Sequence, residues 1–162
     1  MTIEIIEQLE AKDTESAVKL FKKGLAAEIP RGELPDEAIY KELDTTLCLV
    51  YKKGKNLNGL VNFKLNKSRN ITLMFICVSE YRKKIGLKLL HRVACIGSEN
   101  GARWIYAGVS RRDARAVGFY KSLGFRSYKR TGHRGYYIRA KPYEILQKVE
   151  QKIHDLNCKP FD

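Results

Sequence analysis

The chain has 162 residues, 44% of them apolar, which is enough for one domain with a single core. No stretch approaches the roughly 18 uncharged residues of a membrane span, and residues 1–13 contain acids where a secretory leader would have a basic start. We therefore expect a single domain over residues 1–162, cytoplasmic and without membrane contact. The net charge of +13 disfavours polycationic substrates and favours anionic partners such as phosphates or RNA, although a solubilising surface explains it equally well.

Hydrophobic periodicity and turn residues predict a mixed α/β order of elements. In chain order, we expect a strand at 3–6, helices at 14–25 and 35–43, strands at 45–51, 57–65 and 71–78, a helix at 84–100, a strand at 104–109, a helix at 114–123, strands at 125–129 and 136–139, and an appended helix at about 142–157. The run 71–78 is almost continuously apolar, which predicts a central strand buried on both faces. In the helix at 84–100, His91 falls on the polar side.

The turn between the central strand and the helix at 84–100 carries the first candidate site. A helix N-terminus presents unpaired N–H groups and a partial positive charge, and phosphates bind there. Gly86 lets a ligand approach the backbone closely, and Arg82, Lys83, Lys84 and Lys88 supply cations that suit a pyrophosphate. The alternative is an ordinary solvated helix start.

The segment DARAVGFYKSLGF at 113–125 resembles a motif of the GNAT acetyltransferases, N-x-x-A-x-x-F-Y-x-x-x-G-F, with Asp113 where asparagine is usual. The matching residues are Ala116, Phe119, Tyr120, Gly124 and Phe125. The preceding loop resembles the acetyl-CoA motif of the same family through Val78, Tyr81, Arg82, Ile85, Gly86, Leu89 and Leu90. The resemblance covers roughly residues 45–138, with Gly59 in the glycine position of a family strand. The loop is one residue shorter than the family motif. Lys84 stands where a glycine is usual, so its backbone φ must be one that a residue with a side chain tolerates.

The resemblance implies a GNAT fold, with a central mixed sheet of six to seven strands, splayed fourth and fifth strands, and flanking helices. It implies acetyl transfer from acetyl-CoA to a primary amine by direct attack. Tyr120 would protonate the departing thiolate, and a backbone N–H near Val78 would polarise the thioester carbonyl. The implied cofactor-binding residues are Cys77, Val78, Arg82, Lys83, Lys84, Ile85, Gly86, Leu87, Lys88, Asp113, Ala116 and Tyr120.

The general base and the acceptor stay open at this stage. Some relatives carry a glutamate twelve residues before the tyrosine, where this chain has Gly108. Glu80 is the candidate catalytic base, with Tyr106 as a second, and each would act through water; a solvated loop acid is the simpler interpretation of Glu80. A protein or peptide amine is favoured over a small molecule. The alternatives are aminoacyl-tRNA acetylation and a non-catalytic CoA-binding module. The sequence leaves the oligomeric state, monomer or homodimer, open as well.

The cysteines and histidines have no metal-ligand spacing. The four cysteines are widely separated, as are the three histidines. We therefore expect no metal, and we expect the cysteines to be buried reduced thiols.

Overall fold

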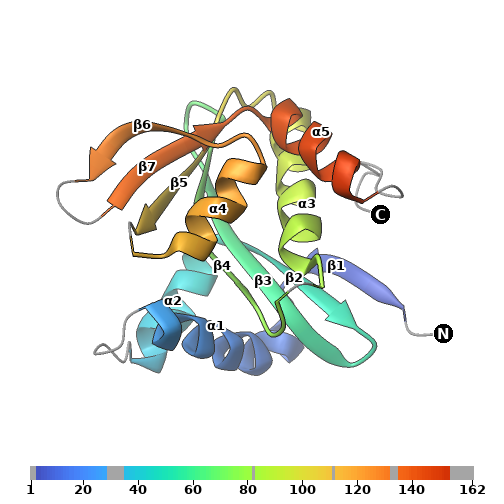
Figure 1. Ribbon diagram of the computed structural model, residues 1–162. Coiled ribbons are helices and arrows are strands. Elements are labelled where there is room, and N and C mark those ends of the chain that lie inside the picture. Colours follow the sequence, from blue (N-terminus) through green and yellow to red (C-terminus); the bar gives the residue numbers. More distant parts are fainter. Residues whose placement is uncertain (1–2, 29–34, 82, 111, 132–134, 154–162) are drawn as a thin grey trace. The chain divides into compact units, whose positions relative to one another are not determined.

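The computed structural model describes residues 3–28, 35–81, 83–110, 112–131 and 135–153 (Figure 1). Its strands are β1 (Glu4–Gln8), β2 (Leu47–Lys53), β3 (Asn56–Leu65), β4 (Ile71–Val78), β5 (Ile105–Ser110), β6 (Arg126–Thr131) and β7 (Gly135–Ala140). Its helices are α1 (Thr14–Glu28), α2 (Asp36–Thr45), α3 (Ile85–Glu99), α4 (Ala114–Ser122) and α5 (Pro142–Lys152), and a short 3-10 helix, η1 (Ala11–Asp13), precedes α1. All predicted elements are present. The part of the last helix predicted beyond residue 153 lies outside the described residues.

The strands follow the order β1-β2-β3-β4-β5-β7-β6, which confirms the mixed sheet and gives it seven strands. Strand β4 pairs with β5 in parallel, and the register joins Ile71 to Ile105 and Thr72 to Tyr106. This pairing lies at the start of both strands, whereas β4 continues to Val78. Strand β5 is paired along its whole length with β7, in antiparallel register. In the described residues, β4 and β5 therefore pair at their first residues, as expected for strands that splay apart further on.

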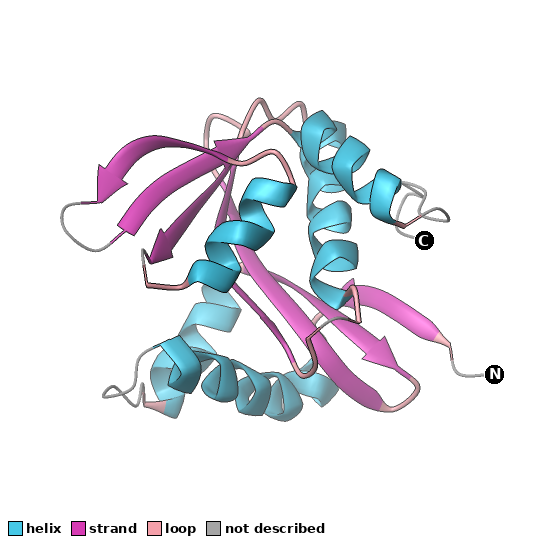
Figure 2. Ribbon diagram, in the orientation of Figure 1, coloured by secondary structure: helices cyan, strands magenta, loops and turns pink. Residues whose placement is uncertain are grey.

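The chain forms two compact units that alternate along the sequence. The first consists of Met1–Phe63 and Phe75–Leu89, and the second of Lys64–Met74 and Leu90–Asp162. In the first unit, the apolar faces of α1 and α2 pack on one face of β2, β3 and the end of β4 (Figure 2). The members of this core cluster are Ala17, Val18, Leu20, Phe21, Ile39, Leu43, Cys48, Val50, Leu60 and Cys77. The amphipathic pattern of the two helices thus determines which strand face they cover.

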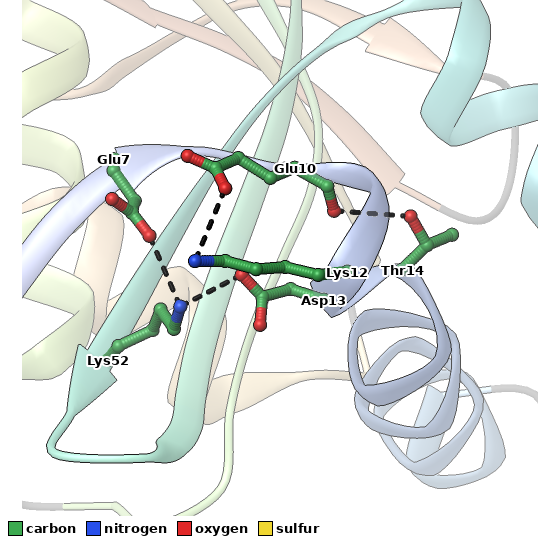
Figure 3. Close-up of polar contacts among 6 residues, drawn as sticks. All are labelled: Glu7, Glu10, Lys12, Asp13, Thr14 and Lys52. Atoms are coloured by element: carbon green, nitrogen blue, oxygen red, sulfur yellow. Dashed lines mark hydrogen bonds and ion pairs between the residues drawn. The ribbon is translucent and has the colours of Figure 1, made fainter.

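An ion-pair network joins the first two strands to the start of α1 (Figure 3). The ammonium of Lys52 in β2 lies 3.2 Å from a carboxylate oxygen of Glu7 in β1 and 2.8 Å from one of Asp13. Asp13 and then Glu7 raise the pKa of Lys52 through these hydrogen bonds. A raised pKa means that this pairing stabilises the fold throughout the neutral range and is lost only as the pH rises through the folded-state value.

We expect the Lys52→Met substitution to lower the free energy of unfolding by about 1–3 kcal/mol, because two carboxylates lose their shared partner. The Lys52 side chain is only 14% exposed, so water replaces the lost contacts poorly. Lys19→Met is the control, since the pair of Lys19 with Glu15 is about 80% exposed and such pairs contribute roughly 0–1 kcal/mol. Denaturant unfolding measures both variants, and equal losses would contradict the assignment.

The second unit corrects two predictions about burial. His91 was expected on the polar side of its helix but is 3% exposed. Its Nε2 lies 3.4 Å from Oε1 of Glu150 in α5, and its Nδ1 lies 3.7 Å from Sγ of Cys95. Burial lowers the pKa of His91, and Glu150 opposes this effect. Strand β4 was expected to be buried on both faces, yet Met74 is 40% exposed.

The cysteines differ from one another. Cys48 and Cys77 are buried free thiols, and burial raises the pKa of Cys48 to about 12. Cys95 is disulfide-bonded, so the prediction of a reduced thiol is wrong for this residue. Cys158 lies outside the described residues.

Candidate active site

The loop after β4 is fixed at both of its ends. Ser79 donates from its backbone N–H to the carbonyl of Asn58 (2.8 Å) and from its hydroxyl to the Asn58 side chain (3.2 Å). At the other end, Lys84 is exposed and has a φ of 61°. This is the left-handed region that glycine favours, so Lys84 adopts a backbone angle that is uncommon for a residue with a side chain. The loop therefore makes its turn without the usual glycine.

The first turn of α3 follows directly. Its first intrahelical hydrogen bond joins the N–H of Lys88 to the carbonyl of Lys84, at 3.0 Å. The amides of Ile85, Gly86 and Leu87 precede that bond, at the positions where a helix leaves N–H groups without an intrahelical partner. Lys83 is exposed beside them, and Arg82 lies outside the described residues. The described turn thus has the donors that a phosphate needs.

A close approach between β3 and α3 holds this helix start in place. A Cβ atom at Gly59 would lie 2.6 Å from Cγ2 of Ile85 and 3.1 Å from Cδ1 of Leu89. The side chain of Ile85 is 5% exposed and that of Leu89 is fully buried. Only glycine at position 59 lets the helix lie this close to the strand.

We expect Gly59→Ala to destabilise the protein by about 1–3 kcal/mol, because the added methyl group forces Ile85 away from the strand. Gly118→Ala in α4 is the matched control, since nothing lies within 4 Å of a Cβ at that position. In an open helical position this change should stabilise by about 0.5–1 kcal/mol. Thermal unfolding compares the two variants, and a neutral Gly59→Ala would show that α3 does not depend on this approach.

Lys88 has partners of its own. Its ammonium lies 2.7 Å from Oε2 of Glu4 and 5.7 Å from the centre of the Tyr51 ring. The hydrogen bond from Lys88 lowers the pKa of Glu4, and burial, followed by Glu4, raises the pKa of Tyr51 to about 12. A phosphate contact by this lysine would therefore compete with Glu4.

The residues at the end of β4 differ in whether their side chains or only their backbones could contact a cofactor. The Cys77 side chain is buried against α1, with Sγ 3.7 Å from the carbonyl oxygen of Leu20, so a contact with a cofactor would fall to its backbone. Val78 is the last residue of the strand and is half-buried. Glu80 is exposed in the bend that follows, where water reaches it.

The second candidate segment begins with a helix cap. Oδ1 of Asp113 accepts a hydrogen bond from the N–H of Ala116 at 3.0 Å, so this aspartate caps the N-terminus of α4. Tyr120 follows two turns later and is 7% exposed. Its ring contacts those of Phe119 and Phe125 edge-on, with centroids 5.4 and 5.0 Å away. The ring of Tyr120 is thus fixed by packing on two sides.

Strand β5 has glycine, and no carboxylate, at position 108. A Cβ at Gly108 would meet only the ring of Tyr137, at 3.9 Å, so the position has room for a side chain that the sequence does not supply. Tyr106 is half-buried, and its ring centroid lies 5.4 Å from that of Tyr128.

One group of residues was missed by sequence reasoning. Arg139 lies over the ring of Trp104, with its guanidinium carbon 3.9 Å from the ring centre, and 5.0 Å from the centre of Tyr128. The available signal was the alternation of aromatic and basic residues with buried ones along 104–109 and 136–139. Within the described residues, no cluster of three or more His, Cys, Asp or Glu side chains suits a metal, and no helix is long and apolar enough to cross a membrane.

Comparison with known proteins identifies the relatives of this chain. Residues 8–147 match the family model described as an acetyltransferase (GNAT) domain. The PaiA N-acetyltransferase of Thermoplasma acidophilum, solved in complex with coenzyme A, has a TM-score of 0.75 and 18% identity over 86% of this chain and 99% of its own. YncA of Salmonella typhimurium, solved with its cofactor acetyl-CoA, has a TM-score of 0.71 and 14% identity over 86% and 94%. The ribosomal-protein-S18-alanine N-acetyltransferase of Escherichia coli has a TM-score of 0.67 and 18% identity over 85% and 91%. No curated protein sequence matches significantly.

Proposed function

Because this chain belongs to the GNAT acetyltransferase family, we propose that it transfers an acetyl group from acetyl-CoA to the primary amine of a protein or peptide. The observation that carries the proposal is the Asp113-capped helix α4, which holds Tyr120 buried between two aromatic rings within the family motif. The similarity to solved structures supports the fold, and their bound CoA supports the choice of donor.

The turn at the start of α3 is our proposed pyrophosphate site. The first-turn amides of Ile85, Gly86 and Leu87 would donate to phosphate oxygens, helped by the helix dipole. Lys83 and Lys84 would add screened positive charge from the exposed side of the turn. Lys88 and Arg82 remain proposed cofactor contacts, as do the backbone of Cys77 and Val78 and the Asp113–Ala116 turn.

Tyr120 is our proposed general acid. The amine nitrogen attacks the thioester carbon, the carbon–sulfur bond breaks with its electron pair going to sulfur, and the Tyr120 hydroxyl supplies the proton. A phenol holds its proton at neutral pH and can donate it as the carbon–sulfur bond breaks. The backbone N–H near Val78 would stabilise the developing negative charge on the carbonyl oxygen.

An α-amine is the acceptor that best suits a site without a strong general base. Its pKa of about 8 leaves part of it neutral at pH 7, whereas a lysine amine of about 10.4 needs a stronger base. Gly108 supplies none, and the exposed Glu80 would act only through water. The E. coli relative is by its name an alanine N-acetyltransferase of a ribosomal protein, which supports the same acceptor class.

Acetyl transfer to peptides with different N-terminal residues, followed by mass spectrometry, tests the proposal. We expect acetylation at the α-amine and none at lysine side chains in the same peptides. Transfer only to small amines or to aminoacyl-tRNA would move the acceptor to those classes. Tight CoA binding without transfer to any amine would leave a non-catalytic module.

A further inference from the structure

A surface hollow in the second unit has both aromatic and basic walls. It has a volume of about 300 Å³ and lies where β5 and β6 begin and β7 ends. We call it the aromatic–basic hollow and define it by five of its lining residues, which are Trp104, Arg126, Tyr128, Arg139 and Lys141. In β7, the half-buried Arg139 stands between the buried Ile138 and Ala140, so its side chain lies on the opposite face of the strand from theirs.

The rings hold the cations in fixed positions. Arg139 lies over Trp104 and near Tyr128, at 3.9 and 5.0 Å, and Nζ of Lys141 lies 5.6 Å from the Trp104 ring centre. Cation–π contacts of this kind orient a planar guanidinium and leave its N–H edges directed outward. Tyr128 remains 43% exposed, so an aromatic surface is available to a ligand as well.

The hollow keeps an excess of positive charge, because three cations line it against a single carboxylate. Arg126, Arg139 and Lys141 line it together with one carboxylate, that of Glu144. Across the ranges that the structure describes, no ion pair within 4.0 Å involves any of these three cations. Such a group attracts an anion, and the net charge of +13 strengthens the attraction.

We propose that the aromatic–basic hollow binds single-stranded nucleic acid, which goes beyond the acetyl-transfer function. Phosphates pair with the three cations, and an unpaired base stacks on an exposed ring, the combination that single-strand binding surfaces use. An acidic peptide offers the charge without flat aromatic faces, and a duplex keeps its bases stacked inside. The three cations of the hollow and the high net charge favour a polymer with several phosphates over a free mononucleotide.

Trp104 is the single tryptophan of the chain, so its fluorescence reports on this hollow directly. We expect a short oligouridylate to change that fluorescence saturably, with saturating CoA present so that the proposed cofactor site is occupied. Three phosphate contacts predict a slope of about −2 for log affinity against log salt, from roughly −0.7 for each contact with a single strand. Lys141→Gln should make that slope about 0.7 less steep and weaken binding several-fold.

Lys148→Gln in α5 is the matched control, because it removes the same charge from an exposed residue outside the lining. Arg139→Gln should weaken binding about tenfold, through loss of a phosphate contact and of the ring support. CoA affinity and thermal stability of each variant are measured alongside; if Arg139→Gln does not fold, Lys141→Gln still decides. An equal loss in Lys148→Gln, or equal affinity for uridine monophosphate, a duplex or a polyglutamate peptide, would overturn the proposal.

Discussion

Replacing Tyr120 by phenylalanine should lower kcat by about 10²–10⁴ while the affinity for acetyl-CoA changes little. The ring stays in its packing between Phe119 and Phe125, so the variant removes only the hydroxyl. A loss that falls on kcat alone is typical of a group that acts in the transition state. Steady-state acetyl transfer, with CoA binding measured by calorimetry, separates the two parameters.

Tyr143→Phe is the control for this experiment, since Tyr143 is 61% exposed in α5 and lies outside the motif. It should retain full activity. A Tyr120→Phe protein that is destabilised yet equally active would assign the tyrosine to the core and leave the thiolate to be protonated by water.

Gly86→Asp should raise the dissociation constant of CoA at least tenfold, which corresponds to about 1.4 kcal/mol. The new carboxylate would stand in the first turn of α3, where the amides and the helix dipole are proposed to receive the pyrophosphate. The new carboxylate repels the negatively charged CoA as well as obstructing it. The loss of CoA affinity should therefore be smaller at high salt, where the repulsion is screened.

Gly86→Asn tests the same position without the charge, since asparagine has nearly the same shape as aspartate. Gly86→Asn should lower the affinity for CoA only by the part that the size of the new side chain causes. Gln147→Glu in α5 adds one negative charge at an exposed site elsewhere and should leave CoA binding unchanged. Unaltered affinity in a folded Gly86→Asp protein would remove this turn from the cofactor site.

Features that depend on neighbouring residues could be predicted from the sequence. The run 71–78 became β4 with the expected bounds, and Asp113 caps α4 because a carboxylate three residues before an amide reaches it locally. The replacement of a motif glycine by Lys84 pointed to an unusual backbone angle, and φ is 61° there. Local chemistry determines all three.

Features that depend on distant parts of the chain could not be predicted. His91 is buried and contacts Glu150, which lies 59 residues away in the sequence, so spacing within its own helix could not show its surroundings. Lys88 pairs with Glu4 across 84 residues of sequence, so its role as a free cation beside the loop could not be judged from spacing. The stack of Arg139 on Trp104 likewise requires the β5–β7 register, which periodicity does not provide.

The alternation of the two units along the sequence has a consequence for biosynthesis. The first unit needs residues 75–89 in addition to 1–63, and the rings of Phe75 and Phe21 meet at 4.3 Å. While the ribosome is still translating the segment after Phe63, the apolar face of α1 has no β4 to cover it. A nascent chain stalled there exposes an apolar surface that chaperones bind or that aggregates. A chain extended past Leu89 contains all the residues of that unit.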